Sequence, residues 1–271
     1  MNTLALFRLR RELARWHAGG HRPVLWWRDD DVRGASPALD RLLRMANGLP
    51  IALAVIPEGV SLTLAARLEG VPGVTVGQHG IDHVNRRMPA EGPAADYASA
   101  VDPSPLARGV MAGRLTLEQF GLEPVFFTPP WNRIEPVLLD ALRIAGYFDV
   151  SGWNGEGAEQ PCLRRLDTHF DLLRWKGGAR FRGAARIYDD LRSHLAERRQ
   201  SGEFQRPIGL LTHHLDHDEA SWKFLEELLD LLRPAVQFRG FGELIETQRP
   251  ARKAVTAAPR KTPTASVALE P

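Results

Sequence analysis

The 271-residue sequence has one cysteine, Cys162, and no apolar run of membrane-spanning length. A single cysteine excludes an internal disulfide and cannot by itself provide a thiolate metal site. A transmembrane helix needs roughly 20 consecutive apolar residues, so none is predicted.

Arginines interrupt the N-terminal stretch, and its apolar residues Leu6, Leu9, Leu13 and Trp16 recur at helical spacing. We therefore expect an amphipathic first helix in place of an export signal, and a cytoplasmic protein.

Strong basicity is also lacking. The net charge is +2, but residues 249–271 carry five basic residues and one glutamate, so residues 1–248 have a net charge of −2. No basic stripe is interleaved with aromatic residues, so we do not expect a nucleic-acid partner. Residues 249–271 are rich in Pro, Ala, Thr and Lys without apolar periodicity, which predicts a disordered tail. The rest reads as one domain over residues 1–248, and its oligomeric state is left open.

Short apolar runs alternate with amphipathic stretches. The predicted strands are residues 24–27, 51–56, 74–77, 125–128, 147–150, 170–175, 208–212 and 236–238. Most lack polar alternation, which is typical of parallel strands that are covered on both faces. Helices are expected after Ser36-Pro37 and Ser104-Pro105, and over residues 135–146, 184–199 and 218–233. This alternation predicts an α/β fold with a barrel-like or doubly wound sheet.

Polar, titratable residues follow four of the predicted strands. They are Asp29-Asp30-Asp31, the stretch from His79 to His83, the stretch from Pro129 to Asn132, and the stretch from His213 to Asp218. Parallel strands bring their carboxyl ends to one edge of a sheet, so these residues are expected to meet there. Four such groups at equivalent positions indicate a functional site.

The residue types in two of these groups favour a metal ion. Adjacent carboxylates repel one another, and a bound cation relieves that repulsion, although an aspartate run can also be a solvated turn. His79 and His83 have the four-residue spacing at which two imidazoles can share a metal, a pattern that also arises by chance. Two imidazoles and one carboxylate leave room for water, as in hydrolytic metal centres. Zinc is the first choice, and cobalt, nickel or iron would fit the same ligands.

The order of the motifs resembles that of the polysaccharide deacetylases, the NodB-like carbohydrate esterase family 4. Residues 29–60 resemble the opening of the family, which has an Asp-Asp pair, a Thr/Ser-Pro, a helix and an apolar strand. Three later segments resemble its further motifs, namely Gly-Gln-His-Gly-Ile-Asp-His, Thr-Pro-Pro-Trp-Asn and Leu-Leu-Thr-His-His. The resemblance spans residues 24 to 247 and implies a distorted (β/α) barrel of largely parallel strands.

The resemblance also implies roles. Asp29 matches the general base, and Asp30 matches a metal ligand beside His79 and His83. His213 matches the general acid that protonates the leaving amine.

Its neighbour His214 is an alternative for the inward-facing position and is otherwise expected to bind substrate. Pro130 and Trp131 match the groove wall, and the Trp131 main-chain N–H would help to hold an oxyanion. The implied activity is metal-dependent removal of N-acetyl groups from an amino-sugar glycan or its precursor.

Three positions depart from the family pattern. Thr128 replaces the arginine that orients the base, and Arg28 or Arg133 are candidates to replace it. Gly80 replaces a threonine, and Asp31 stands where glycine is common. Two alternatives therefore stay open: a hydrolase of another non-peptide C–N or ester bond, and a non-catalytic carbohydrate- or metal-binding relative. His169, Asp171 and Lys176, which flank or lie in a further predicted strand, are candidates to line the groove.

Overall fold

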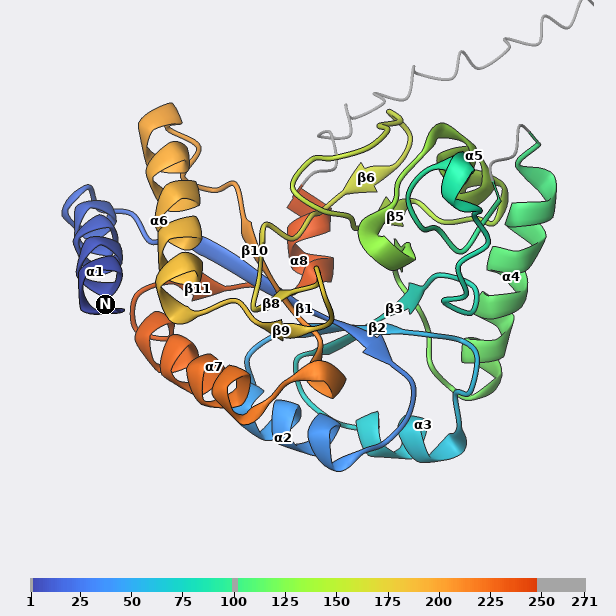
Figure 1. Ribbon diagram of the computed structural model, residues 1–271, viewed down its shortest axis with the longest axis horizontal. Helices are drawn as coiled ribbons and strands as arrows, with labels where there is room; N and C mark the ends of the chain where they lie inside the picture. The colour runs from blue at the N-terminus through green and yellow to red at the C-terminus, as the bar shows by residue number, and fades with distance from the viewer. Residues whose placement is uncertain (1, 99–101, 248–271) are drawn as a thin grey trace, which may run out of the picture.

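The computed structural model describes residues 2–98 and 102–247 (Figure 1). The predicted tail at residues 249–271 lies outside this range. A nine-stranded sheet runs in the order β6-β5-β4-β3-β2-β1-β10-β7, with β11 pairing the start of β1. Every pairing within it is parallel. The sheet curls into a half-barrel, so the predicted α/β barrel of parallel strands is confirmed.

The strands of this sheet are β1 (Val24–Val32), β2 (Ile51–Val55), β3 (Val74–His79), β4 (Phe127–Thr128), β5 (Asp149–Val150), β6 (Arg164–Arg165), β7 (Phe170–Asp171), β10 (Ile208–Thr212) and β11 (Gln237–Phe238). A separate antiparallel pair is formed by β8 (Leu173–Arg174) and β9 (Arg180–Phe181). The apolar run at 170–175 therefore divides. Its first half joins the parallel sheet, and its second half turns away to pair with β9 beside the site.

The helices are α1 (Asn2–Ala18), α2 (Pro37–Ala46), α3 (Leu62–Leu68), α4 (Ser104–Gln119), α5 (Pro136–Ile144), α6 (Ala184–Ser201), α7 (Glu219–Leu232) and α8 (Phe241–Thr247). Short 3-10 turns are η1 (Pro89–Glu91), η2 (Pro130–Asn132) and η3 (His214–Asp216). Ser36 caps α2 by accepting a hydrogen bond from the Leu39 amide, as the Ser-Pro pattern predicts. No helix in the described ranges is long and apolar enough to cross a membrane.

Two layers of apolar side chains fix the strand that carries the aspartates. Leu25 and Trp27 of β1 pack outward, in one cluster with buried residues of α1, α2, α3, α6 and α7. Val24 and Trp26 pack inward, with Phe126 and residues of α8. Helices α1 and α6 lie side by side at one end of the molecule, and α4 and α5 cover the other end (Figure 1). Because β1 alternates between these layers, each later side chain has a defined face.

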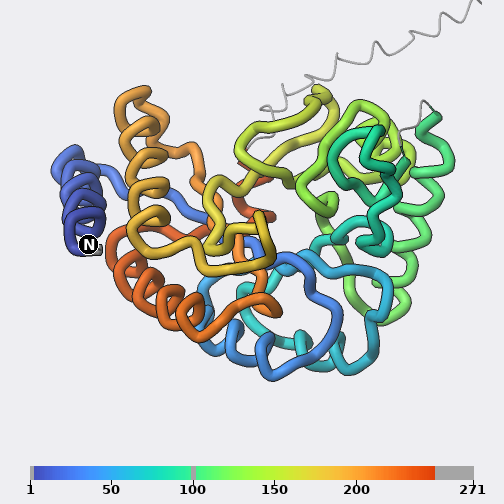
Figure 2. The backbone as a smooth tube through the Cα atoms, viewed as in Figure 1, coloured from blue at the N-terminus to red at the C-terminus, as the bar shows by residue number. Residues whose placement is uncertain are grey.

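Segments far apart in the sequence meet at the centre of the sheet. Strand β10 lies beside β1, with Asp29 opposite Thr212. The tube in Figure 2 shows the orange chain of β10 next to the blue chain of β1. The carboxyl ends of β1, β3, β4 and β10 therefore reach one edge, which is where the four polar motifs begin.

Candidate functional site

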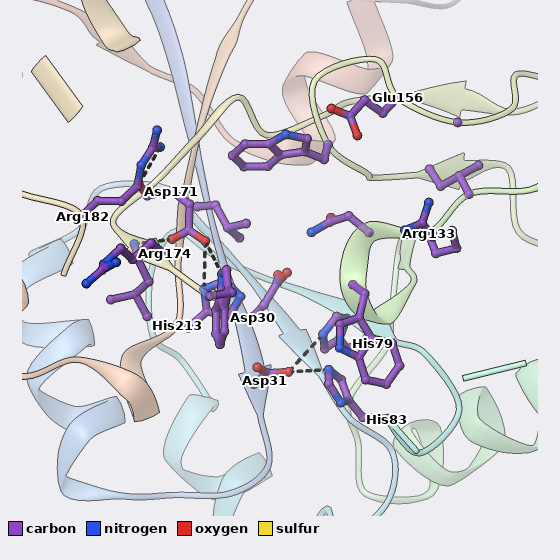
Figure 3. Close-up of a pocket in the computed structure, with 18 residues that line it drawn as sticks. Asp30, Asp31, His79, His83, Arg133, Glu156, Asp171, Arg174, Arg182 and His213 are labelled. Carbon is purple, nitrogen blue, oxygen red and sulfur yellow. Dashed lines mark hydrogen bonds and ion pairs between the residues drawn. The ribbon is translucent and has the colours of Figure 1, made fainter. Parts of the chain in front are cut away.

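A cavity of about 490 Å³ lies at this carboxyl edge (Figure 3). It is lined by residues from all four motifs, among them Asp30, His79, Trp131 and His213. The expectation that the strand ends converge is met.

The cavity contains a cluster of one carboxylate and two imidazoles. Asp31 Oδ1 lies 3.1 Å from Nε2 of His79 and 3.1 Å from Nε2 of His83. All three candidate ligand atoms lie within 4.8 Å of one another. Ligand atoms about 2.0–2.1 Å from a tetrahedral zinc ion would lie about 3.3 Å apart, which is close to these spacings. The two histidines are those that the sequence predicted, whereas the carboxylate is Asp31 and not Asp30.

The hydrogen bonding of His79 fits a metal ligand. Its Nδ1 lies 3.1 Å from the main-chain oxygen of Thr128, which can only accept, so Nδ1 carries the proton and Nε2 presents a lone pair. That lone pair faces Asp31 Oδ1, a buried oxygen that accepts no hydrogen bond. Two electron-rich atoms at this distance repel one another unless a cation is shared between them. The residues therefore fit a divalent ion.

The electrostatics of the cluster also favour an added positive charge. Burial alone would raise the pKa of the Asp31 carboxyl, but the imidazoles of His79 and His83 outweigh burial and hold that pKa well below its usual range. Burial alone would lower the pKa of His79, but the carboxylates of Asp30 and Asp31 raise it. The lowered pKa of Asp31 and the raised pKa of His79 both indicate that the cluster favours an added positive charge, which either a proton or a metal ion would supply.

A β-bulge explains why Asp31 reaches the cavity. The pairing of β1 with β2 shifts register between Asp29 and Val32, and Asp31 has a left-handed φ of 66°. Strict alternation would send Asp31 to the outer face with Asp29, whereas the bulge turns it toward the same cavity as Asp30. The structure thus places two adjacent carboxylates in one site.

Arg28 holds Asp30 in place. Its Nε donates to Asp30 Oδ1 at 2.7 Å, and its Nη2 donates to Oδ2 at 2.9 Å. The same guanidinium donates to Ser151 Oγ at 2.5 Å and to Asn132 Oδ1 at 2.6 Å. Arg28 and Asp30 are both buried. Of the two arginines considered as replacements for the family arginine missing at Thr128, the structure selects Arg28 to orient a site carboxylate.

Asp29 lies outside the cavity, on the outer face of the sheet. Its Oδ1 is 2.5 Å from His214 Nδ1, and its Oδ2 accepts hydrogen bonds from Thr212 Oγ1 at 2.6 Å and from the His214 amide at 3.1 Å. Neither Asp29 nor His214 lines the cavity, and both are buried. The sequence expectation that Asp29 is the base and His214 binds substrate therefore lacks the necessary geometry. The expected pair was Asp29 and Asp30, whereas the two aspartates that line the cavity are Asp30 and Asp31.

His213 lines the cavity and faces a carboxylate. Its Nδ1 lies 3.7 Å from Oδ2 of Asp171, and that oxygen accepts a hydrogen bond from Trp175 Nε1 at 3.0 Å. The Trp175 ring packs edge-on against the His213 ring, with centroids 4.5 Å apart. Burial alone would lower the pKa of His213, but the Asp171 carboxylate, helped by Asp30 and Asp31, raises it to about 9. This direction of the pKa shift favours the protonated form of His213 at neutral pH.

The turn after β4 forms a further part of the wall. Trp131 lines the cavity, is 42% exposed, and has its ring centroid 4.6 Å from that of His83. Pro130, which was expected in the groove wall, is buried and does not line the cavity, and a Cβ at Gly80 would lie 2.5 Å from its Cδ. Gly80 also has a φ of 66°, so a larger residue there would be strained. Glycine in place of the family threonine thus matches the local packing.

Two elements of the site were not assigned from the sequence. The first is the bulge that moves Asp31 inward, which strand alternation cannot reveal. The second is the pairing of Asp171 with His213. The sequence does show a strand that ends in Asp171, with Trp175 four residues later. It does not show that this strand, β7, lies next to β10, which carries His213 at its end.

Comparison with known proteins agrees with this fold. A family 4 acetyl xylan esterase from Clostridium thermocellum, solved with a cobalt ion, matches with a TM-score of 0.51 and 14% identity, over 83% of this chain and 91% of that one. A carbohydrate esterase family 4 pseudoenzyme from Bacillus anthracis matches with a TM-score of 0.52 and 12% identity, over 83% of this chain and 66% of that one. The resemblance to polysaccharide deacetylases is confirmed at the level of the fold.

The same fold extends to a different kind of enzyme. A 4-alpha-glucanotransferase from Thermococcus litoralis matches with a TM-score of 0.51 and 10% identity, over 85% of this chain and 41% of that one. No protein-family model and no curated protein matches the sequence. At these identities the fold is shared, and function must be argued from the site residues.

Proposed function

We propose that the protein is a metal-dependent deacetylase that removes N-acetyl groups from an amino-sugar glycan or glycan precursor. One observation carries the proposal: a cluster that fits a metal ion, a clamped carboxylate and a histidine that faces a second carboxylate line the same cavity. Amide hydrolysis needs an activated water, charge stabilisation on the carbonyl oxygen and a proton for nitrogen.

Asp31, His79 and His83 would hold the ion, and zinc is the first choice, with cobalt, nickel or iron as alternatives. When bound, the ion would act as a Lewis acid toward water and the substrate carbonyl. The His79 Nδ1–H to Thr128 contact orients the ring and leaves Nε2 available as the atom that would hold the ion.

Asp30 is the proposed general base. Arg28 occupies one lone pair on each of its oxygens, which leaves a second on each to accept a proton from water. The water oxygen then forms a bond to the amide carbon. His213 gives its proton to the amide nitrogen, the C–N bond breaks, and acetate and an amine are released. Asp171 stabilises the charged form of His213 that this step requires.

Acetate release from N-acetylglucosamine oligomers tests the proposal directly. We expect release by the purified protein, loss of activity after treatment with a chelator, and recovery when zinc or cobalt is added back. Asp30→Asn is the matched inactive control, because it keeps the size of the side chain and the metal ligands. Activity that persists without metal would contradict the proposed role of the ion.

The same assay separates the two alternatives. A panel of acetyl esters and cyclic amides would reveal a hydrolase of other bonds. A binding protein without activity would need neither the Arg28–Asp30 clamp nor the Asp171–His213 pair, and the presence of both favours catalysis. If no substrate in the panel is hydrolysed by the metal-loaded protein, the non-catalytic alternative gains support.

A further inference from the structure

Most charges that line the cavity are matched within the protein. Asp30 is paired with Arg28, and Asp31 lies against the two imidazoles of the metal cluster. Asp171 accepts hydrogen bonds from Trp175 and from a main-chain amide and faces His213. Among the positively charged residues of the lining, Arg182 forms an ion pair with Asp190 at 2.6 Å.

Arg133 is different, because it lines the cavity with a guanidinium that is not matched. Its Nε is buried and has no hydrogen-bond partner among the described residues. A nearby acid, Glu135, is held by both Nη atoms of Arg87, at 2.7 Å and 2.6 Å. Glu135 is therefore neutralised by another arginine, and the charge of Arg133 remains in excess.

The main chain of Arg133 is fixed although its side chain is unpaired. Its amide donates to the Pro130 oxygen at 3.3 Å, and its own carbonyl oxygen accepts a hydrogen bond from the Tyr97 hydroxyl at 2.9 Å. It follows Trp131 and Asn132, whose left-handed φ values hold the turn that carries it. The backbone of Arg133 is thus held in place, and its guanidinium remains available to pair with a ligand.

We propose that Arg133 binds an anionic group, a carboxylate or a phosphate, on the sugar that enters this cavity. This proposal rests on the proposed function, which puts a sugar there, and it narrows the substrate class to acidic amino sugars or sugar phosphates. The planar guanidinium matches either anion with two parallel hydrogen bonds. The exposed face of Trp131, beside it in the chain, offers a stacking surface for the sugar ring.

The remaining charges around the cavity are consistent with this assignment. Glu156 lines it too, but its side chain is exposed, so water screens its charge. Arg174 adds a further exposed positive charge, on the wall across from Arg133 (Figure 3). A divalent ion at Asp31 would make the cavity more positive still.

Calorimetric titration with sugars that contain no amide tests the proposal independently of hydrolysis. The ligands are methyl glucoside, its uronate analogue with a carboxylate, and glucose 1-phosphate. We expect the full-length protein to bind at least one of the two anionic sugars about tenfold to a hundredfold more tightly than the neutral one. Tighter binding of the uronate would identify a carboxylate as the recognised anion, and tighter binding of glucose 1-phosphate would identify a phosphate. Because none of the ligands can be deacetylated, failure of the deacetylase proposal would not affect this result.

Two variants complete the experiment. Arg133→Gln should reduce the affinity for the anionic sugar to within about twofold of the neutral one, while Arg143→Gln, an exposed arginine at the end of α5, should keep the preference. Arg133→Lys, which keeps the charge without the forked geometry, should retain part of the preference and serves if Arg133→Gln does not fold. Equal affinity for all three sugars in the wild type would overturn the proposal. A preference that persists in Arg133→Gln would also overturn it.

Discussion

Arg28 and Asp30 lie two residues apart on β1, and the guanidinium of one donates two hydrogen bonds to the carboxylate of the other, at 2.7 Å and 2.9 Å. Residues at this spacing on a strand share a face, so the strand itself brings the pair together. Thr128 stands where the resembled family has an arginine. The arginine that holds the proposed base is therefore local in the sequence here, two residues before the carboxylate.

Replacing Arg28 should affect both activity and stability. Arg28→Lys keeps the charge but loses the fork, and we expect kcat to fall by about a hundredfold because Asp30 is no longer held in one orientation. Arg28→Met leaves a buried carboxylate without its partner, and we expect the free energy of unfolding to drop by about 3–5 kcal/mol. Steady-state kinetics and urea denaturation measure the two effects. A fully active Arg28→Met protein would contradict the assigned role.

The two cavity carboxylates should separate in a metal-binding experiment. Asp31→Asn should lower metal affinity by at least about tenfold, because a ligand is weakened, whereas Asp30→Asn should keep the ion. Asp30→Asn should instead lower kcat by about a hundredfold to ten-thousandfold, as expected for a lost general base. Elemental analysis after dialysis, combined with acetate release, distinguishes them. The reverse pattern, with the ion lost from Asp30→Asn, would restore Asp30 as the ligand.

The sequence was sufficient for the architecture and for the histidines of the site. Apolar runs such as 208–212 coincide with strands, and His79 and His83 lie close together because His79 ends β3 and His83 follows in the turn after it. The sequence assigned Asp30 to the metal cluster, whereas Asp31 lies beside the two histidines, and a run of three identical side chains does not show which of them does so. A bulge that turns Asp31 inward depends on pairing with β2, and the sequence of β1 does not contain that information.

The contact between Asp171 and His213 is a second feature that the sequence alone does not show. It depends on β7 lying beside β10, and the paired residues Asp171 and Leu211 are forty positions apart in the sequence. Short strands such as β6 and β9 give too few residues for a periodic pattern, and they were not predicted. The sequence thus supplied the residue types, and tertiary pairing decided which of them face one another.

Asp29 should matter for folding more than for chemistry. Asp29→Asn leaves His214 buried beside a neutral partner, and we expect the free energy of unfolding to fall by about 3–5 kcal/mol while the surviving folded protein keeps its metal. Chemical denaturation of Asp29→Asn, His214→Gln and the double variant measures the coupling of the pair. The double variant should lose less stability than the two single losses combined. A loss of activity as large as that of Asp30→Asn, without destabilisation, would instead restore Asp29 as the base.

The raised pKa of His213 gives the activity a predictable dependence on pH. An acid must be protonated to act, so activity should fall as the pH rises through about 9, the value to which the Asp171 carboxylate raises this pKa against the effect of burial. Asp171→Asn removes that carboxylate, and the alkaline limb of kcat/KM should move to lower pH by about one pH unit or more. Asp230→Asn, the same change at an exposed position on α7, should leave the limb in place. A limb that stays near its wild-type position in Asp171→Asn would show that another group supplies the proton.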